Sequence, residues 1–100
     1  MPDALTFPRL KPHVIVSPLV QYAKCGEELG ELSQKLTLLL GVEIRKPRPD
    51  NIAEQAIEEC IDLAQAAVSM AFAVAGLCGH DMLEAAMARH IDKMRERGYL

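Results

Sequence analysis

The chain has 100 residues, half of them hydrophobic, and a formal net charge of −3 at neutral pH. This length is enough for one domain but not for two, and the apolar content argues against a disordered chain. The small negative charge gives no general attraction to nucleic acid or to an anionic membrane, so we expect neither as a partner. The beginning of the chain has no basic region followed by an apolar run, and we expect a cytoplasmic protein whose three cysteines are reduced and mostly buried.

The first 16 residues contain three prolines and predict an extended N-terminal arm, with residues 14–16 as a candidate short strand. Residues 17–100 are predicted to form the helical domain. Ser17 and Pro18 mark the start of its first helix, with serine as the N-cap and proline at the first helical position. Apolar residues at helical spacing continue this helix to about Leu40.

The second predicted helix follows a proline-containing loop at residues 42–50. It begins near Asn51, where Asn51 and Glu54 have the spacing of a capping box, and runs to about Leu77. Its second half is rich in alanine. The apolar stretch at residues 63–78 is shorter than the roughly 20 residues that a membrane span needs, which favours a buried helix of a bundle.

A third helix is predicted from about Asp81 to Arg95, after a break at Gly76 and Gly79 and before Gly98. The predicted fold is therefore an all-α, antiparallel helical bundle of three helices, or of four if the alanine-rich helix is interrupted. A core this small is only marginally stable, so we expect the protein to self-associate as a homodimer or homotetramer.

Two short acidic clusters at residues 27–31 and 58–62 share the pattern acid-acid-x-x-acid. Together they contain six of the fourteen acidic residues of the chain. In a helix, the three acids of each cluster fall within a sector of about 100°. The clusters consist of Glu27, Glu28 and Glu31, and of Glu58, Glu59 and Asp62.

Such clusters on two helices that pack against each other would repel, unless a cation neutralises them. Mg²⁺ is the cation that fits best, because it prefers carboxylate oxygens and bridges them to substrate phosphates; Mn²⁺ is the alternative. Gly26 and Gly30, one turn apart, suggest a close approach of a ligand or another backbone, or simply a crowded crossing. From the spacing alone, two solvated acidic faces with no shared site are as good an interpretation as a metal site.

The acidic clusters resemble those of the MazG-like all-α nucleoside triphosphate pyrophosphohydrolases, whose signature is EExxE, a variable loop and ExxD. The resemblance extends over residues 17–99. It is carried by the segments Gln21-x-x-Lys24-x-x-Glu27-Glu28-x-Gly30-Glu31-Leu32 and Glu58-Glu59-x-x-Asp62, and by a tail, Lys93-Met94-x-x-Arg97-Gly98-Tyr99, in which Met94 replaces the asparagine of the family.

This resemblance implies a Mg²⁺-dependent enzyme that cleaves the bond between the α- and β-phosphates of a (d)NTP and releases (d)NMP and pyrophosphate. The implied metal ligands are Glu28, Glu31, Glu59 and Asp62. Glu27 and Glu58 are the implied catalytic carboxylates, which orient or deprotonate water or join a second metal ion. The candidates for substrate binding are Lys24, Lys93, Arg97 and Tyr99.

Two other functions are compatible with the sequence. One is a non-catalytic helical module that keeps the acidic pattern but acts through oligomerisation or a protein partner. The other is an enzyme like the phosphoribosyl-ATP pyrophosphohydrolases of the same superfamily, which performs closely related chemistry on a different nucleotide.

Overall fold

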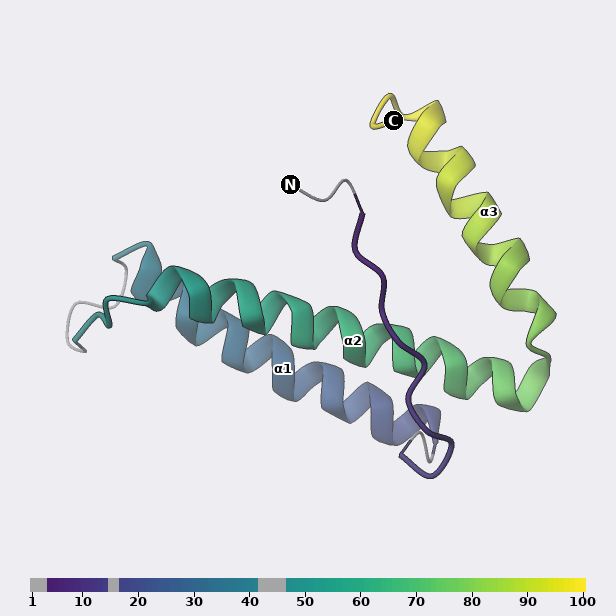
Figure 1. Ribbon diagram of the computed structural model, residues 1–100, viewed down its shortest axis with the longest axis horizontal. Coiled ribbons are helices and arrows are strands. Elements are labelled where there is room, and N and C mark those ends of the chain that lie inside the picture. The colour runs from purple at the N-terminus through teal and green to yellow at the C-terminus, as the bar shows by residue number, and fades with distance from the viewer. Residues whose placement is uncertain (1–3, 15–16, 42–46) are drawn as a thin grey trace.

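The computed structural model describes residues 4–14, 17–41 and 47–100. These residues contain three helices and no strand: α1 (Pro18–Leu39), α2 (Ile52–Cys78) and α3 (Asp81–Glu96) (Figure 1). The predicted all-α class is thus confirmed. The alanine-rich part of α2 is continuous, so the four-helix alternative is wrong. The candidate strand at residues 14–16 and the loop at residues 42–50 fall partly outside the described residues.

The ends of α1 follow the local signals in the sequence. The side-chain oxygen of Ser17 accepts a hydrogen bond of 3.1 Å from the backbone N–H of Val20, which is the expected N-cap. Just beyond the other end, Gly41 has a φ of +72°, a conformation that favours glycine and ends the helix.

The predicted capping box at the start of α2 does not form. Asn51 is the N-cap residue of α2, but its side chain makes no capping hydrogen bond. The Asn51 Oδ1 atom instead accepts a hydrogen bond of 2.8 Å from the side-chain amide of Gln55, one turn further along the helix. This competing side-chain partner occupies the oxygen that would otherwise cap the backbone.

The helices α1 and α2 form an antiparallel hairpin and pack along most of their length (Figure 1). The residues that α2 buries are mostly small, and their small side chains let the two helices approach closely. The two fully buried residues of α1 are both polar, Gln21 and Glu28. The seam between α1 and α2 is therefore a place where polar groups are enclosed. The buried residues of α2 are Ile52, Ala56, Ala66, Ser69, Ala73 and Ala75.

The third helix leaves this hairpin instead of completing a compact bundle. After Gly79, whose φ is +135°, α3 turns away from α2, packs only against its end and makes no contact with α1 (Figure 1). The radius of gyration is 16.4 Å, whereas a compact chain of this length has about 13 Å. Within one chain, α1 and α2 are the only described helices that form the predicted bundle.

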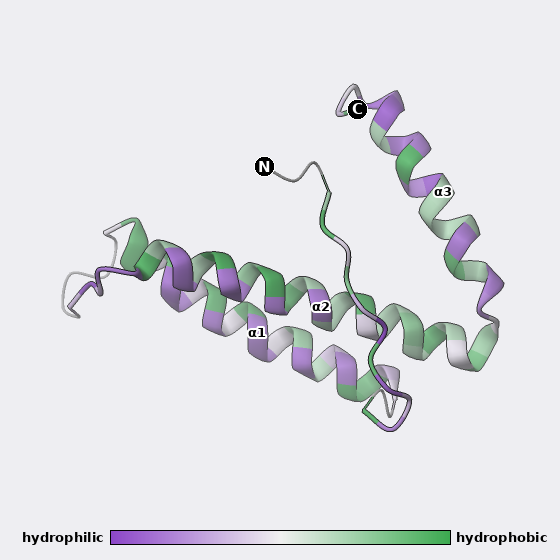
Figure 2. Ribbon diagram, in the orientation of Figure 1, coloured by the Kyte–Doolittle hydropathy of each residue, from purple (hydrophilic) through white to green (hydrophobic). Residues whose placement is uncertain are grey.

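The second half of α2 is apolar, as the green ribbon in Figure 2 shows. Several of its large side chains are exposed, among them Val74 and Leu77. This helix is long and apolar enough to cross a membrane, with a mean hydropathy of 1.7 over its most apolar 18-residue window. Only 22% of that window is buried, so the prediction of a buried helix is wrong for the single chain. The prediction of buried thiols is wrong as well, because Cys60 and Cys78 are exposed on α2 and Cys25 is only half-buried.

Candidate metal centre

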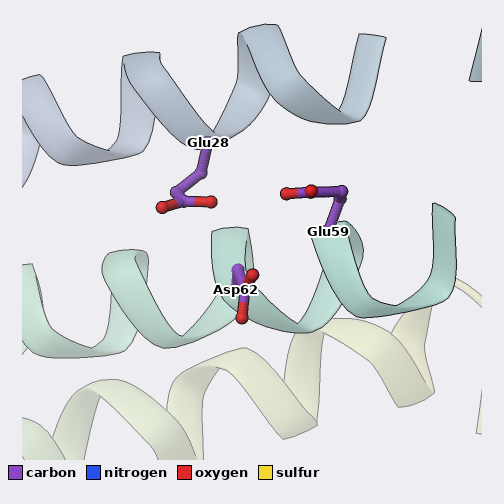
Figure 3. Close-up of side chains that lie close together, drawn as sticks. All are labelled: Glu28, Glu59 and Asp62. Carbon is purple, nitrogen blue, oxygen red and sulfur yellow. The ribbon is translucent and has the colours of Figure 1, made fainter. Parts of the chain in front are cut away.

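Three carboxylates from α1 and α2 meet across the seam of the hairpin. Glu28 comes from α1, and Glu59 and Asp62 come from neighbouring turns of α2 (Figure 3). One carboxylate oxygen of each residue lies within 4.8 Å of the other two. Because α1 and α2 are antiparallel and both acidic clusters lie near the middle of the packed length, the two clusters face each other. The shared site predicted from the sequence is therefore sterically available.

The burial of these carboxylates is what distinguishes them from a solvated acidic face. Glu28 is only 6% exposed, Glu59 is half-buried and Asp62 is exposed. Among the described residues, the Oε2 atoms of Glu28 and Glu59 are buried and have no hydrogen-bond partner. Enclosing an ionised oxygen without a partner costs several kcal/mol, as an order of magnitude, so these two atoms favour the binding of a cation or a proton.

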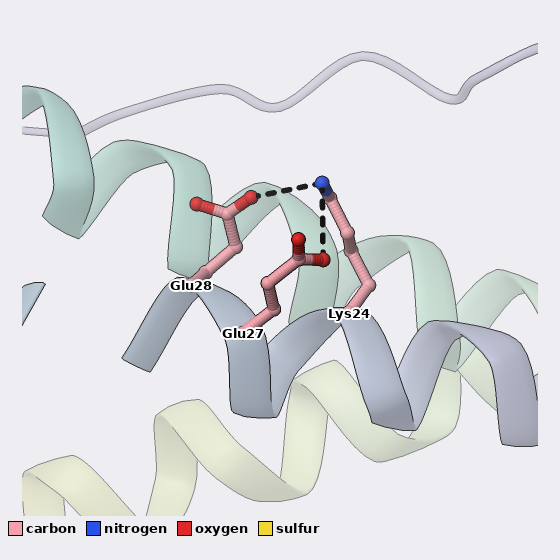
Figure 4. A network of polar contacts seen from close by, with 3 residues as sticks. All are labelled: Lys24, Glu27 and Glu28. Carbon is pink, nitrogen blue, oxygen red and sulfur yellow. Dashed lines mark ion pairs between the residues drawn. The ribbon is translucent and has the colours of Figure 1, made fainter. Parts of the chain in front are cut away.

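Lys24 neutralises part of this negative charge. Its Nζ atom lies 3.1 Å from Glu28 Oε1 and 3.6 Å from Glu27 Oε2, as the dashed lines in Figure 4 show. The hydrogen bond to Glu28, followed by the charges of Glu27 and Glu28, raises the pKa of Lys24 above its ordinary value. This ammonium group reaches Glu28 from the α1 side, while no described residue is a hydrogen-bond partner of Glu28 Oε2. One lysine thus leaves the cluster with excess negative charge.

Glu31, the fourth predicted ligand, lies beside the three carboxylates. It is exposed, and its pKa is raised mainly by the negative charge of Glu28 and next by that of Glu59. These influences show that Glu31 is close to ligand candidates on both helices. It is not part of the group whose oxygens lie within 4.8 Å of one another.

The two predicted catalytic carboxylates lie at the edge of the cluster. Glu27 is exposed and pairs with Lys24 on the surface of α1 (Figure 4). Glu58 is exposed on α2, four residues before Asp62 and therefore on the same side of the helix. Neither is buried, so both can exchange protons with water.

The predicted substrate-binding residues of the tail lie elsewhere. Lys93 is in the last turn of α3, Arg97 follows that helix, and Tyr99 is 71% exposed. The end of α3 is far from the seam between α1 and α2 (Figure 1). A single chain therefore brings only Lys24 of the four predicted substrate-binding residues to the carboxylates.

A cavity of about 370 Å³ adjoins the carboxylates and contains polar residues to which the sequence analysis gave no role in a site. Gln21 and Ser69 are buried there, and Gln65 is half-buried. A signal existed, since a polar residue on the apolar face of a helix is unusual, but the predicted bundle gave no reason to place these three together. The cavity is lined by Leu10, Val14, Val20, Gln21, Lys24, Glu28, Asp62, Gln65, Ala66 and Ser69.

The donor set fits a hard divalent cation. It consists of carboxylate oxygens only, with no described histidine or cysteine in the group, and such oxygen ligands suit Mg²⁺ or Mn²⁺ better than zinc or copper. The unpartnered Oε2 atoms of Glu28 and Glu59 are the atoms that a cation would satisfy. The geometry thus allows the binding of a hard divalent cation.

Comparisons with models of known protein families, with curated proteins and with solved structures gave no match to this chain.

Proposed function

We propose that this protein is a Mg²⁺-dependent nucleotide pyrophosphohydrolase that cleaves a (d)NTP between its α- and β-phosphates. The observation that carries the proposal is the buried carboxylate of Glu28, which meets two carboxylates of another helix and whose Oε2 atom has no hydrogen-bond partner among the described residues. Three acids at this separation repel one another unless a cation is shared between them. The resemblance of both acidic motifs to the MazG-like superfamily supports membership of that superfamily and the choice of substrate.

In the proposed reaction, Glu28, Glu59 and Asp62 would hold the metal ion, and Glu31 would add a fourth carboxylate beside them. Bound Mg²⁺ would supply a Lewis acid for the phosphate oxygens and a more acidic water molecule. Glu58 or Glu27, both exposed next to the ligand candidates, accepts the proton of the attacking water. Lys24 offers a positive charge for the phosphates when it leaves Glu28.

We also propose that the working form is a homo-oligomer. No residue of α3 is fully buried in the single chain, although an isolated helix of 16 residues is marginal in water. The exposed apolar residues of the α2–α3 region would be covered by a second copy, and Lys93, Arg97 and Tyr99 could then approach the site of a neighbouring subunit. These exposed residues include Val74, Leu77, Met82 and Met87.

The same apolar surface favours a second candidate function, a non-catalytic interaction module. Its exposure is unusual for a monomeric soluble protein and marks a binding surface. In that case the acidic cluster would be a structural cation site, and assembly rather than hydrolysis would be the biochemical role. The surface alone is compatible with both functions, so turnover has to separate them.

The deciding experiment incubates the full chain with a panel of (d)NTPs and phosphoribosyl-ATP in Mg²⁺, and measures released pyrophosphate. We expect release that EDTA abolishes and that Glu28→Gln lowers by at least about a hundredfold, the scale of losing one group that organises the reacting charges. The matched control is Glu54→Gln, which removes an exposed acid of α2 outside the cluster. Metal binding without hydrolysis of any nucleotide favours the interaction module, and preference for phosphoribosyl-ATP identifies the related enzyme.

A further inference from the structure

The N-terminal arm, residues 4–14, is fastened across the hairpin at several points. The side-chain amide of Gln65 on α2 donates a hydrogen bond of 3.1 Å to the backbone carbonyl of Pro8. The amide of Gln21 on α1 donates one of 3.3 Å to the carbonyl of Val14. The guanidinium of Arg9 stacks 5.3 Å from the ring centre of Phe72. The arm thus touches both helices and, in Figure 1, crosses α2 on its way to the start of α1.

The two hydrogen-bonded attachments use buried or half-buried polar side chains with defined partners. Gln21 is 7% exposed, and Gln65 also donates to the hydroxyl of Ser69, which is 1% exposed. An amide that donates both to a backbone carbonyl and to a buried hydroxyl is fixed in orientation. The position of the arm is therefore set by side chains that belong to the cavity itself.

The arm supplies one wall of the cavity that adjoins the metal ligands. Leu10 and Val14 of the arm line it together with Ala66 of α2, and the carboxylates of Glu28 and Asp62 line it as well. Its volume of about 370 Å³ is within the usual range for a small-molecule site. Apolar side chains with a few polar groups suit a flat heterocycle, and the lysine and carboxylates suit phosphates with their cation.

We infer that the arm forms a wall of the nucleoside pocket, and that Leu10 contacts the base or sugar while Gln65 positions the arm. This inference rests on the proposed function and adds to it where the nucleoside lies. The phosphates lie at Glu28 and Asp62, and the nucleoside extends beneath the arm towards Gln21 and Ser69. The substrate is thus recognised partly by a segment outside the helical domain.

The test compares Leu10→Ala and Gln65→Leu with Leu5→Ala, a control that changes an exposed arm residue outside the cavity. Steady-state kinetics with the preferred nucleotide should show a KM about tenfold higher for both cavity variants, the scale of lost apolar contact in a binding pocket, with kcat nearly unchanged. Binding of Mg²⁺–pyrophosphate, which lacks the nucleoside, should match that of the parent, whereas binding of the nucleoside monophosphate should weaken.

The outcomes separate this inference from the function on which it rests. If the parent hydrolyses nucleotides and both cavity variants keep its KM, the arm is not a wall of the nucleoside pocket. If pyrophosphate binding weakens as much as nucleoside monophosphate binding, the arm acts on the whole site and the inference is likewise overturned. If the parent neither binds nor hydrolyses any nucleotide, the proposed function fails, and this inference fails with it. Circular dichroism checks that all variants keep the helical content of the parent.

Discussion

Replacing Glu28 with glutamine should stabilise the protein without metal and remove its response to Mg²⁺. Glu28 is almost fully buried, and one of its oxygens lies within 4.8 Å of oxygens of Glu59 and Asp62. At that separation and an effective dielectric constant near 20, each ionised pair repels by about 3.5 kcal/mol. The exposure of Asp62 and the nearby ammonium of Lys24 reduce the net repulsion.

We expect Glu28→Gln to raise the free energy of unfolding in EDTA by about 2 kcal/mol, since it removes one charge from this repulsion. In Mg²⁺ the variant should lose this advantage in stability over the parent. A cation at 100 times its dissociation constant stabilises the parent by about 2.7 kcal/mol, whereas the variant lacks a central ligand and should gain little. The parent should therefore become at least as stable as the variant.

Thermal unfolding followed by circular dichroism measures both effects at one fixed protein concentration, because self-association also shifts the melting temperature. For a chain of this size, about 2 kcal/mol corresponds to roughly 10 °C. Glu54→Gln is the control: it removes an acid from the first turn of α2, so it should lower the stability in EDTA by less than about 1 kcal/mol, and it should keep the gain of the parent in Mg²⁺. Two results together would refute the shared carboxylate site. Glu28→Gln would be less stable than the parent in EDTA, and Mg²⁺ would leave the melting temperature of the parent unchanged.

Three further predictions concern other parts of the molecule. Neighbouring carboxylates raise the pKa of Glu31 in the folded state, so its contribution to stability is fully present below its unfolded pKa and is lost as the pH rises through the folded pKa. In EDTA, the melting temperature of Glu31→Gln should therefore fall less between pH 4 and pH 7 than that of the parent. An equal fall in the two proteins would contradict this prediction. Gly30→Ala should stabilise α1 by about 1 kcal/mol in denaturant unfolding, because an added Cβ meets no described atom within 4 Å; destabilisation would instead reveal a partner packed on that face. Leu77→Lys, at a position 75% exposed, should weaken self-association in sedimentation experiments, whereas an unchanged mass would mean that this face is not an interface between copies.

The sequence was sufficient for features that depend on neighbours along the chain. Ser17 and Pro18 start α1 where predicted, because a cap and a fixed φ act within one turn. The register of each acidic cluster also followed from helical geometry, and so did the expectation that Glu28, Glu59 and Asp62 could share a site once α1 and α2 packed together.

Other features were decided only by the tertiary structure. The direction of α3 depends on the turn at Gly79 and on the fact that α3 buries no residue fully. The spacing of the apolar residues of α3 specifies neither of these features. Sequence spacing could not tell which acids are enclosed: it treats Glu27 and Glu28 alike, yet one is exposed and the other buried. The hydrogen bond that holds the arm joins Pro8 and Gln65, which are 57 positions apart, and the cavity beneath the arm is lined by residues of the arm, α1 and α2. Burial and long-range contact are properties of the packed chain, because they depend on which surfaces meet, and local sequence patterns do not specify that.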